Sequence, residues 1–330
     1  MRRRACFAIN CMLPLSPLTR SYTLPGKALL FGEYGLLLGL PGVVVTLPAF
    51  PMEVVCSLIP AKGTPEVRIK SALLPKQHLT LRGGERGFFP SLLAPYQEVL
   101  THFRRKGYDL TMAVTRYFPP SLGMGSSSAL LASFHAFLFS FLDAAPPLSS
   151  PIFFERLHTS INDCQGAGSG YDATLQLAAQ GSSVPQLWRY QRAPHAALPD
   201  FSVLPPSSKK AVHYGTILKT NRYARTKKAL KRFATSGDPS LAQAHGALAT
   251  RFLQDPSPSH LLGLMEEAQH LQKQQGILPN LPLLQRLRAA QVPFKSLGAG
   301  FGDCLWSPWK AEGLSEFQEA IVTEVILPCA

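Results

Sequence analysis

Apolar residues along the chain follow either helical or alternating spacing, and glycine- and proline-rich turns separate these segments. The spacing predicts helices over residues 94–106, 129–142, 153–162, 226–233, 240–252, 261–274 and 282–290. It predicts strands over 109–117, 210–218, 294–297 and 320–327, while residues 28–50 fit a strand, a turn and a second strand. Helices and strands are mixed along the chain, which indicates an α+β fold, and the Pro/Ser-rich residues 204–208 are the best candidate for a linker.

Composition narrows the class of protein. The chain has 330 residues, of which 46% are hydrophobic and 16% charged, so it can bury one large core or two modest ones and is not disordered. Its net charge of +13 favours anionic partners. The longest apolar stretch, 129–142, is interrupted by Ser133, His135 and Ser140 and is too short to span a bilayer.

The cysteines and the N-terminus indicate a cytoplasmic protein. The six cysteines are scattered and include no CxxC pair, which fits reduced thiols and gives no zinc-type spacing. Residues 1–20 are expected to form a disordered tail, or Met12 is the working start. An export signal is disfavoured because Asn10 interrupts a poor apolar run.

A glycine- and serine-rich turn carries the clearest chemistry. After a predicted strand, Gly123 and Gly125 permit unusual backbone angles, and three serines then begin an apolar helix. The free N–H groups of such a helix start bind anions, although serine is also an ordinary helix cap. The Walker A, dinucleotide-binding and nucleophile-elbow patterns are all absent from the sequence, so a different phosphate-binding solution is indicated.

Three segments resemble the motifs of the GHMP kinases, in family order and across nearly the whole chain. They are residues 25–34 (PGKALLFGEY), 123–129 (GMGSSSA) and 297–304 (LGAGFGDC). The resemblance implies an α+β two-domain fold, with an N-terminal ATP-binding domain over 21–205 and a ferredoxin-like C-terminal domain over 206–330. It also implies ATP and Mg²⁺ as cofactors and an active site between the domains.

Within that family, residues 165–172 (QGAGSGYD) are similar to a segment of phosphomevalonate kinases, whereas residues 220–230 resemble a substrate-side segment of mevalonate kinases. The first likeness implies ATP-dependent phosphorylation of phosphomevalonate to diphosphomevalonate, in isoprenoid precursor synthesis. The alternatives are a mevalonate kinase that phosphorylates the mevalonate hydroxyl, or an inactive family member that acts as a binding module. We expect a small-molecule substrate, no nucleic acid or membrane partner, and a monomer or homodimer.

The resemblance also assigns roles to residues. Asp172 and Lys27 match the catalytic pair, with Asp172 taking or orienting the acceptor proton and Lys27 keeping it ionised. Without the other motifs, Asp172 would be interpreted as a helix cap and Lys27 as a solvated loop lysine. The residues expected to bind ATP are Gly123, Met124, Gly125, Ser126, Ser127 and Ser128.

The metal and substrate sites are less completely matched. Ser127 is expected to contact Mg²⁺, but Ile161 stands eleven residues before Asp172, where many family members have an acidic ligand. Asp163 is therefore the candidate second ligand, with Glu155 or water as alternatives. The residues expected to bind substrate are Glu33, Tyr34, Ser169, Gly170, Arg222, Arg225, Thr226, Gly300 and Asp303. The basic run at 219–232 fits either a substrate phosphate or a solvated helix face.

Overall fold

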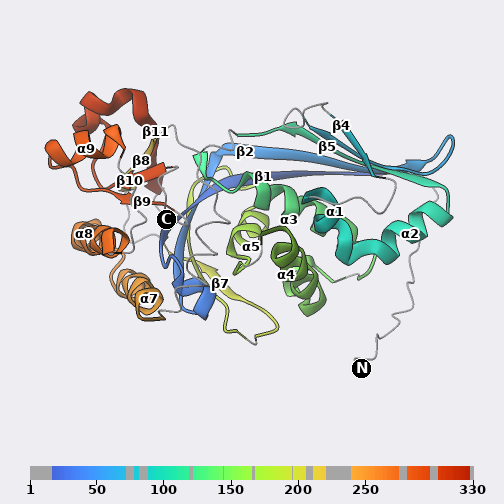
Figure 1. Cartoon of the computed structure of the whole chain (residues 1–330), viewed down its shortest axis with the longest axis horizontal. Coiled ribbons are helices and arrows are strands. Elements are labelled where there is room, and N and C mark those ends of the chain that lie inside the picture. Colours follow the sequence, from blue (N-terminus) through green and yellow to red (C-terminus); the bar gives the residue numbers. More distant parts are fainter. Residues whose placement is uncertain are drawn as a thin grey trace.

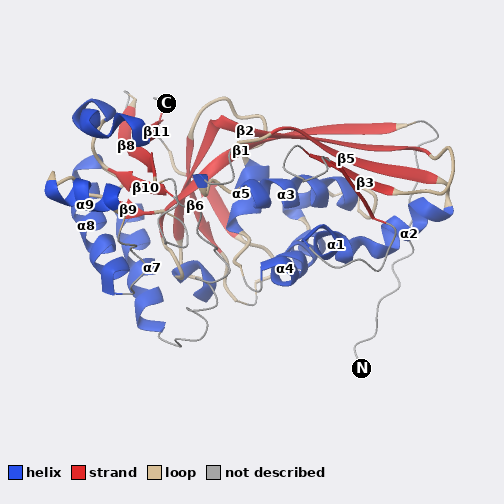
Figure 2. Ribbon diagram, turned by 45° about the horizontal axis from the view of Figure 1, so that its top comes forward, coloured by secondary structure: helices blue, strands red, loops and turns tan. Residues whose placement is uncertain are grey.

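The computed structural model of the chain contains two β-sheets with helices packed against them (Figures 1 and 2). It describes residues 17–71, 78–81, 88–118, 122–143, 145–165, 168–194, 196–205, 211–220, 239–274, 281–297 and 304–327. The arrangement is α+β, as the mixed helical and alternating segments predicted. No helix in these ranges combines the length and apolar character that crossing a membrane requires.

The first sheet has seven strands within the described ranges. They are β1 (Leu18–Phe31), β2 (Gly42–Pro60), β3 (Val67–Ser71), β4 (His78–Leu81), β5 (Tyr108–Arg116), β6 (Gln186–Gln191) and β7 (Asp200–Val203). The order is β4-β3-β5-β2-β6-β7, and β1 also pairs with β2. The long strand β2 is central, because β1 follows its length antiparallel while β5 pairs with residues 53–60 and β6 with residues 42–46.

The described helices of the first half of the chain pack on this sheet or on one another (Figure 2). They are α1 (Phe88–Leu93), α2 (Gln97–Arg105), α3 (Ser126–Phe139), α4 (Pro151–Gln165) and α5 (Tyr171–Ala178), with short 3-10 turns η1 (Gly35–Leu38), η2 (Ala94–Tyr96) and η4 (Pro147–Ser149). All of α3 from Ser128 to Phe139 is buried. Its His135 lies between Tyr96 and Ser160, and burial lowers the pKa of this imidazole to about 3, so it is a neutral core residue.

The second sheet has the strand order β11-β8-β10-β9 and is antiparallel. Its strands are β8 (Val212–Lys219), β9 (Lys295–Ser296), β10 (Cys304–Ser307) and β11 (Ile321–Leu327). The helices described in this half are α7 (Pro239–Gln254), α8 (Pro258–Gln274), α9 (Pro282–Ala289) and the kinked 3-10 segment η5 (Ala311–Ala320). The predicted linker at 204–208 begins between β7 and β8, so the expected boundary after residue 205 falls where the chain changes sheet.

One continuous core joins the two halves. The ring of Phe31, at the end of β1, lies 5.3 Å from that of Phe252 on α7 and 5.5 Å from that of Trp306 on β10. Residues 24–31 of β1 and 42–47 of β2 are buried throughout, because α3 and α7 both pack against these strands. The end of β1 is therefore interior to the whole molecule.

The predicted elements match those observed, with boundary differences. The helix expected at 129–142 is α3, which begins three residues earlier at Ser126 and ends at Phe139. The patterns missed β3, β4, β6, β7, β10, α1 and α5. Most of these are short, and a short segment carries too few residues for its spacing to distinguish one structure from another. The basic helix expected at 226–233 lies outside the described residues.

Candidate functional site

Lys27 lies on β1 directly after an irregularity in the pairing of β1 with β2. The register shifts between Pro25 and Gly26, which leaves residues 48–50 of β2 without partners on β1. A bulge of this kind bends a strand and re-aims the side chains beside it. Lys27 is paired with Thr46 of β2, and its N–H donates to the carbonyl of Met124 over 3.1 Å. The irregularity thus brings β1 against the turn that precedes α3.

The ammonium of Lys27 is directed at the start of α5. Its Nζ lies 2.5 Å from Asp172 Oδ1 and donates to the hydroxyl of Tyr171 over 3.0 Å. The Lys27 side chain is 6% exposed and that of Asp172 is 32% exposed, so the carboxylate is the member of the pair that meets solvent. Burial, and then the charge of Asp172, raise the pKa of the Tyr171 phenol well above its ordinary value, which keeps this hydroxyl protonated.

Gly170 permits the turn that places Asp172. It precedes α5 with φ of +78°, a left-handed conformation that favours glycine. A Cβ at this position would lie 3.1 Å from the ring of His158, so the site has little room for a side chain. Asp172 consequently falls in the first turn of α5, where the partial positive charge of the helix stabilises a carboxylate.

The turn before α3 leaves the start of that helix open. Gly125 precedes the helix with φ of +82°, and within the described residues no side chain caps its first turn. The N–H groups of a 14-residue helix are therefore available at this end, and such an end binds anions. Gly125 is also adjacent to Lys27, because a Cβ built on it would lie 2.8 Å from Lys27 Cε.

The three serines of this turn differ in their surroundings. The hydroxyl of Ser128 is buried and donates to the carbonyl of Gly125 over 2.9 Å, so it is used within the helix. Ser126 is half-buried and Ser127 is exposed. Ser127 thus presents the most accessible hydroxyl of the three, and its contact with a metal stays a prediction.

Replacing Gly125 by Ala is expected to lower the free energy of unfolding by about 3 kcal/mol. A left-handed non-glycine residue costs roughly 1–2 kcal/mol, and the new methyl group would also lie 2.8 Å from Lys27 Cε and Ser128 Oγ. Gly181→Ala is the matched control, since Gly181 has φ of +77° but nothing within 4 Å of its Cβ position. Urea denaturation of both variants measures the difference, and equal losses would show that residue 125 is not crowded.

No protein-family model and no curated protein matches this chain. Solved structures do match it over most of its length. Phosphomevalonate kinase from Streptococcus pneumoniae, solved with phosphomevalonate and AMPPNP, has a TM-score of 0.67 and 15% identity, covering 94% of this chain and 100% of that chain. L. major mevalonate kinase with R-mevalonate has a TM-score of 0.65 and 19% identity, covering 96% and 99% of the two chains. Lactococcus lactis galactokinase has a TM-score of 0.62 and 16% identity over 94% and 93%.

The chain has the GHMP kinase fold. The expected two-domain architecture with a ferredoxin-like C-terminal half is confirmed at this level. At identities of 14–19%, the likeness establishes the fold, and the reaction must be argued from the residues.

The GHMP fold buries two of the predicted substrate residues. Glu33 is 1% exposed, and Lys295 Nζ donates to its Oε1 while its Oε2 lies 3.5 Å from His245 Nδ1. Tyr34 packs on Ala242, with φ of 59° and its ring 6.1 Å from that of His245. A direct contact between substrate and the Glu33 carboxylate would require Lys295 to release it.

Charge compensation explains how Glu33 stays ionised in this environment. Burial alone would raise the pKa of its carboxyl, but the charge of Lys295 and the contact with His245 outweigh burial and lower this pKa. Glu33 belongs to the first half of the chain, while Lys295 is on β9 and His245 on α7. The buried cluster of Glu33, His245 and Lys295 therefore joins the two halves.

The remaining predicted residues of the first half surround α5 and α4. Ser169 is half-buried, and its carbonyl accepts from the hydroxyl of Tyr190 over 3.0 Å. Ile161 is buried in the core, whereas Asp163, on the same helix α4, is exposed. No three His, Cys, Asp or Glu side chains cluster as metal ligands in the part of the chain that the structure describes.

Five predicted substrate residues lie outside the described residues: Arg222, Arg225, Thr226, Gly300 and Asp303. Two described residues near these five, Lys219 and Cys304, show where the segments that carry them begin and end in the fold. Lys219 pairs with Cys304 across β8 and β10. The thiol of Cys304 donates to the carbonyl of Leu122 over 3.0 Å, directly before Gly123. The third motif therefore ends against the turn that precedes α3.

Sequence reasoning missed Tyr171, Gln176, His245 and Lys295 as parts of this region. Gln176 had one available signal, since it is a polar residue one helical turn after Asp172 among apolar neighbours. Lys295 had a similar one, as a lysine inside a strand-like segment. Neither signal identifies a partner, because the partners are distant in the sequence.

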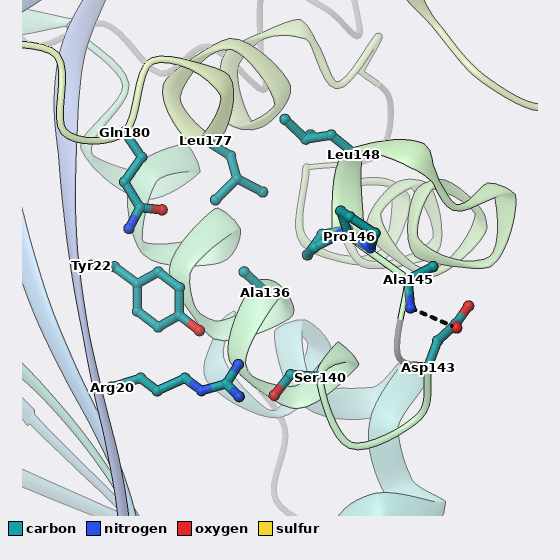
Figure 3. A pocket seen from close by; sticks show the side chains of 11 residues that line it. Arg20, Tyr22, Ala136, Ser140, Asp143, Ala145, Pro146, Leu148, Leu177 and Gln180 are labelled. Atoms are coloured by element: carbon teal, nitrogen blue, oxygen red, sulfur yellow. Dashed lines mark hydrogen bonds between the residues drawn. The ribbon is translucent and has the colours of Figure 1, made fainter.

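A separate cavity of about 520 Å³ lies between β1, α3 and α5 (Figure 3). Its lining includes Arg20 and Tyr22 of β1, Ser140 after α3, and Leu177 of α5. Lys27 and Asp172 are not among its lining residues. Lys27 on β1 and Asp172 on α5 therefore lie outside the cavity, although β1 and α5 also contribute to its lining.

Proposed function

We propose that the chain is an ATP-dependent small-molecule kinase of the GHMP type. The observation that carries this proposal is the contact of 2.5 Å between Lys27 Nζ and Asp172 Oδ1, with Gly125 and the open start of α3 against the same lysine. Phosphoryl transfer requires a positioned acceptor and neutralisation of charge on the moving group, and little covalent help. A carboxylate, an ammonium and an anion-binding helix start supply these functions.

Each residue has a defined role in this proposal. Asp172, the more exposed member of the pair, accepts or orients the proton of the acceptor oxygen. Lys27 holds this carboxylate in place and offsets negative charge on the transferred phosphoryl group. The turn of residues 123–126 and the first N–H groups of α3 hold the phosphates of ATP.

Mg²⁺ is part of the proposal, with Ser127 as its protein contact and Asp163 as the candidate second ligand. Both side chains are exposed, which suits a cation that keeps several waters and binds chiefly to nucleotide phosphates. When bound, Mg²⁺ would neutralise phosphate charge. Ile161 occupies the position of the usual acidic ligand and cannot replace it.

We also propose that residues 21–205 and 206–330 are two domains with the acceptor site between them. The contact of Cys304 with Leu122 and the buried cluster of Glu33 and Lys295 support this arrangement, because both tie the second sheet to the motif segments of the first. A cytoplasmic location is proposed from the sequence pattern of the cysteines, which are scattered and include no CxxC pair.

Phosphomevalonate is the proposed acceptor, in isoprenoid precursor synthesis. The support is the likeness of residues 165–172 to phosphomevalonate kinases, and the S. pneumoniae phosphomevalonate kinase is among the similar structures. Mevalonate is the alternative acceptor, supported by residues 220–230 and by the mevalonate kinases of similar fold.

An acceptor comparison tests the proposal. The purified chain is incubated with ATP and Mg²⁺ and with phosphomevalonate, mevalonate or galactose, and the products are followed by ADP release and ³¹P NMR. We expect a diphosphate signal with phosphomevalonate alone. A monophosphate formed only from mevalonate would establish the alternative, and the absence of transfer to any acceptor would favour a binding module.

A further inference from the structure

The side-chain amide of Gln176 joins α5 to the two segments that carry the rest of the site. Its Nε2 donates to the carbonyl of Pro25 over 2.8 Å and to that of Gly125 over 3.2 Å. Gln176 is completely buried and lies one helical turn after Asp172, on the same side of α5. One amide group therefore contacts β1 two residues before Lys27, and α3 at the residue before its first turn.

Burying the side-chain amide of Gln176 costs free energy unless the amide forms hydrogen bonds. A buried amide without hydrogen bonds destabilises a fold, and an apolar side chain would pack at this position of α5 without that cost. The two hydrogens of Nε2 suffice for the two carbonyls it contacts, whereas Oε1 has no hydrogen-bond partner within the described residues. The position thus uses the donor end of the side chain.

The two carbonyls depend on Gln176 to different degrees. The Gly125 carbonyl also accepts from Ala129 N and from Ser128 Oγ, each over 2.9 Å. The Pro25 carbonyl lies where the pairing of β1 with β2 is interrupted. Loss of the amide would therefore loosen β1 at the irregularity that positions Lys27.

We propose that Gln176 is a positioning residue that fixes the distances among Lys27, Asp172 and the start of α3. The consequence for turnover rests on the proposed kinase function, whereas the consequence for Lys27 does not. Because reacting groups displaced by about 1 Å lose roughly a hundredfold in rate, Gln176 affects kcat more than nucleotide affinity.

Three variants separate hydrogen bonding from packing. Gln176→Met keeps the length of the side chain but removes both donors. Gln176→Glu keeps the shape but leaves at most one donor, the O–H of a protonated carboxyl, for the two carbonyl oxygens. Gln180→Met, at an exposed position just after α5, makes the same chemical change as the first variant away from these contacts. We expect kcat to fall at least tenfold in both Gln176 variants, with KM for ATP within about threefold of the wild type.

A stability-matched variant excludes partial unfolding as the cause. Phe103→Leu makes a buried truncation on α2, which packs on β5 away from these contacts. A kcat loss in Phe103→Leu equal to that in Gln176→Met at similar Tm would overturn the proposal. So would wild-type kcat in Gln176→Glu.

A readout without substrate tests Gln176 even if the chain is not a kinase. The native protein is treated with acetic anhydride, and mass spectrometry measures the acetylation rate of Lys27. The Lys27 side chain is 6% exposed in its pair with Asp172, so we expect acetylation to be several-fold faster in Gln176→Met than in the wild type or Gln180→Met. An unchanged Lys27 rate would overturn the proposal whatever the activity assays give, and a wild type without phosphoryl transfer would count against the proposed function alone.

Discussion

Asp172→Asn is expected to lower kcat for phosphoryl transfer by about 10³-fold or more, while ATP binding changes little. The amide has the shape of the carboxylate but cannot take the proton of the acceptor, and a positioned acid–base group contributes roughly 10²–10⁴-fold. The added loss comes from Lys27, whose buried ammonium would no longer face a negative charge at 2.5 Å. Steady-state kinetics measure the loss, and titration with a fluorescent ATP analogue measures nucleotide affinity.

The control for this prediction is Asp200→Asn. Asp200 pairs with Arg189 on the surface, at 2.5 Å, and its side chain is 65% exposed. The same chemical change there is expected to leave kcat within about twofold, because exposed ion pairs contribute little. Turnover near the wild-type rate in Asp172→Asn would exclude Asp172 from the reaction.

Lys27→Met completes the test of the pair. If Lys27 and Asp172 act as a unit, the double variant is expected to be hardly slower than either single variant, since residues that act together are strongly non-additive. Losses that simply multiply would mean that the two residues act independently, despite their contact in the structure.

The start of α3 and the pair of Lys27 and Asp172 differed in how far they could be predicted from the sequence. The open start of α3 follows from local signals, because Gly125 and the serines after it lie together in the chain and act through backbone geometry. The pairing of Lys27 with Asp172 does not follow from local patterns. It came from the likeness of residues 25–34 and 165–172 to family segments, and the structure now places the two side chains in contact.

Glu33 illustrates what local reasoning could not supply. A glutamate beside glycines is expected at a surface turn, and its burial depends on Lys295, which is 262 positions away. Gln176 is similar, since its two acceptors are 151 and 51 positions away. The irregularity of β1 that positions Lys27 also depends on its pairing with β2. Such contacts arise when separate elements pack, and no short window of sequence contains both partners.

Lys295→Met is expected to lower the free energy of unfolding by about 3–5 kcal/mol, the usual cost of leaving a buried charge without its partner. Lys295 is completely buried and Glu33 is 1% exposed, and the two side chains are hydrogen-bonded. Glu33→Gln is expected to have a comparable effect for the same reason. Urea denaturation at pH 7 measures both losses.

The double variant distinguishes a charge effect from a packing effect. Glu33→Gln/Lys295→Met removes both charges, so we expect it to be more stable than either single variant, because a buried ion pair contributes little beyond mutual compensation. The control is Glu267→Gln, which breaks the pair of Arg251 and Glu267, at 2.6 Å with both side chains nearly half exposed, and is expected to cost less than about 1 kcal/mol.

The pH dependence of stability is an independent test of the coupling between Glu33 and Lys295. Since the pKa of Glu33 is lowered in the folded state, its contribution to stability is complete above the ordinary glutamate value of about 4.3 and is lost as the pH falls through the folded value. A group of this kind titrates over about pH 5 to pH 3. Over this range, the double variant should therefore lose less free energy of unfolding than the wild type. Equal acid sensitivity, together with additive losses at pH 7, would mean that Glu33 and Lys295 are not coupled.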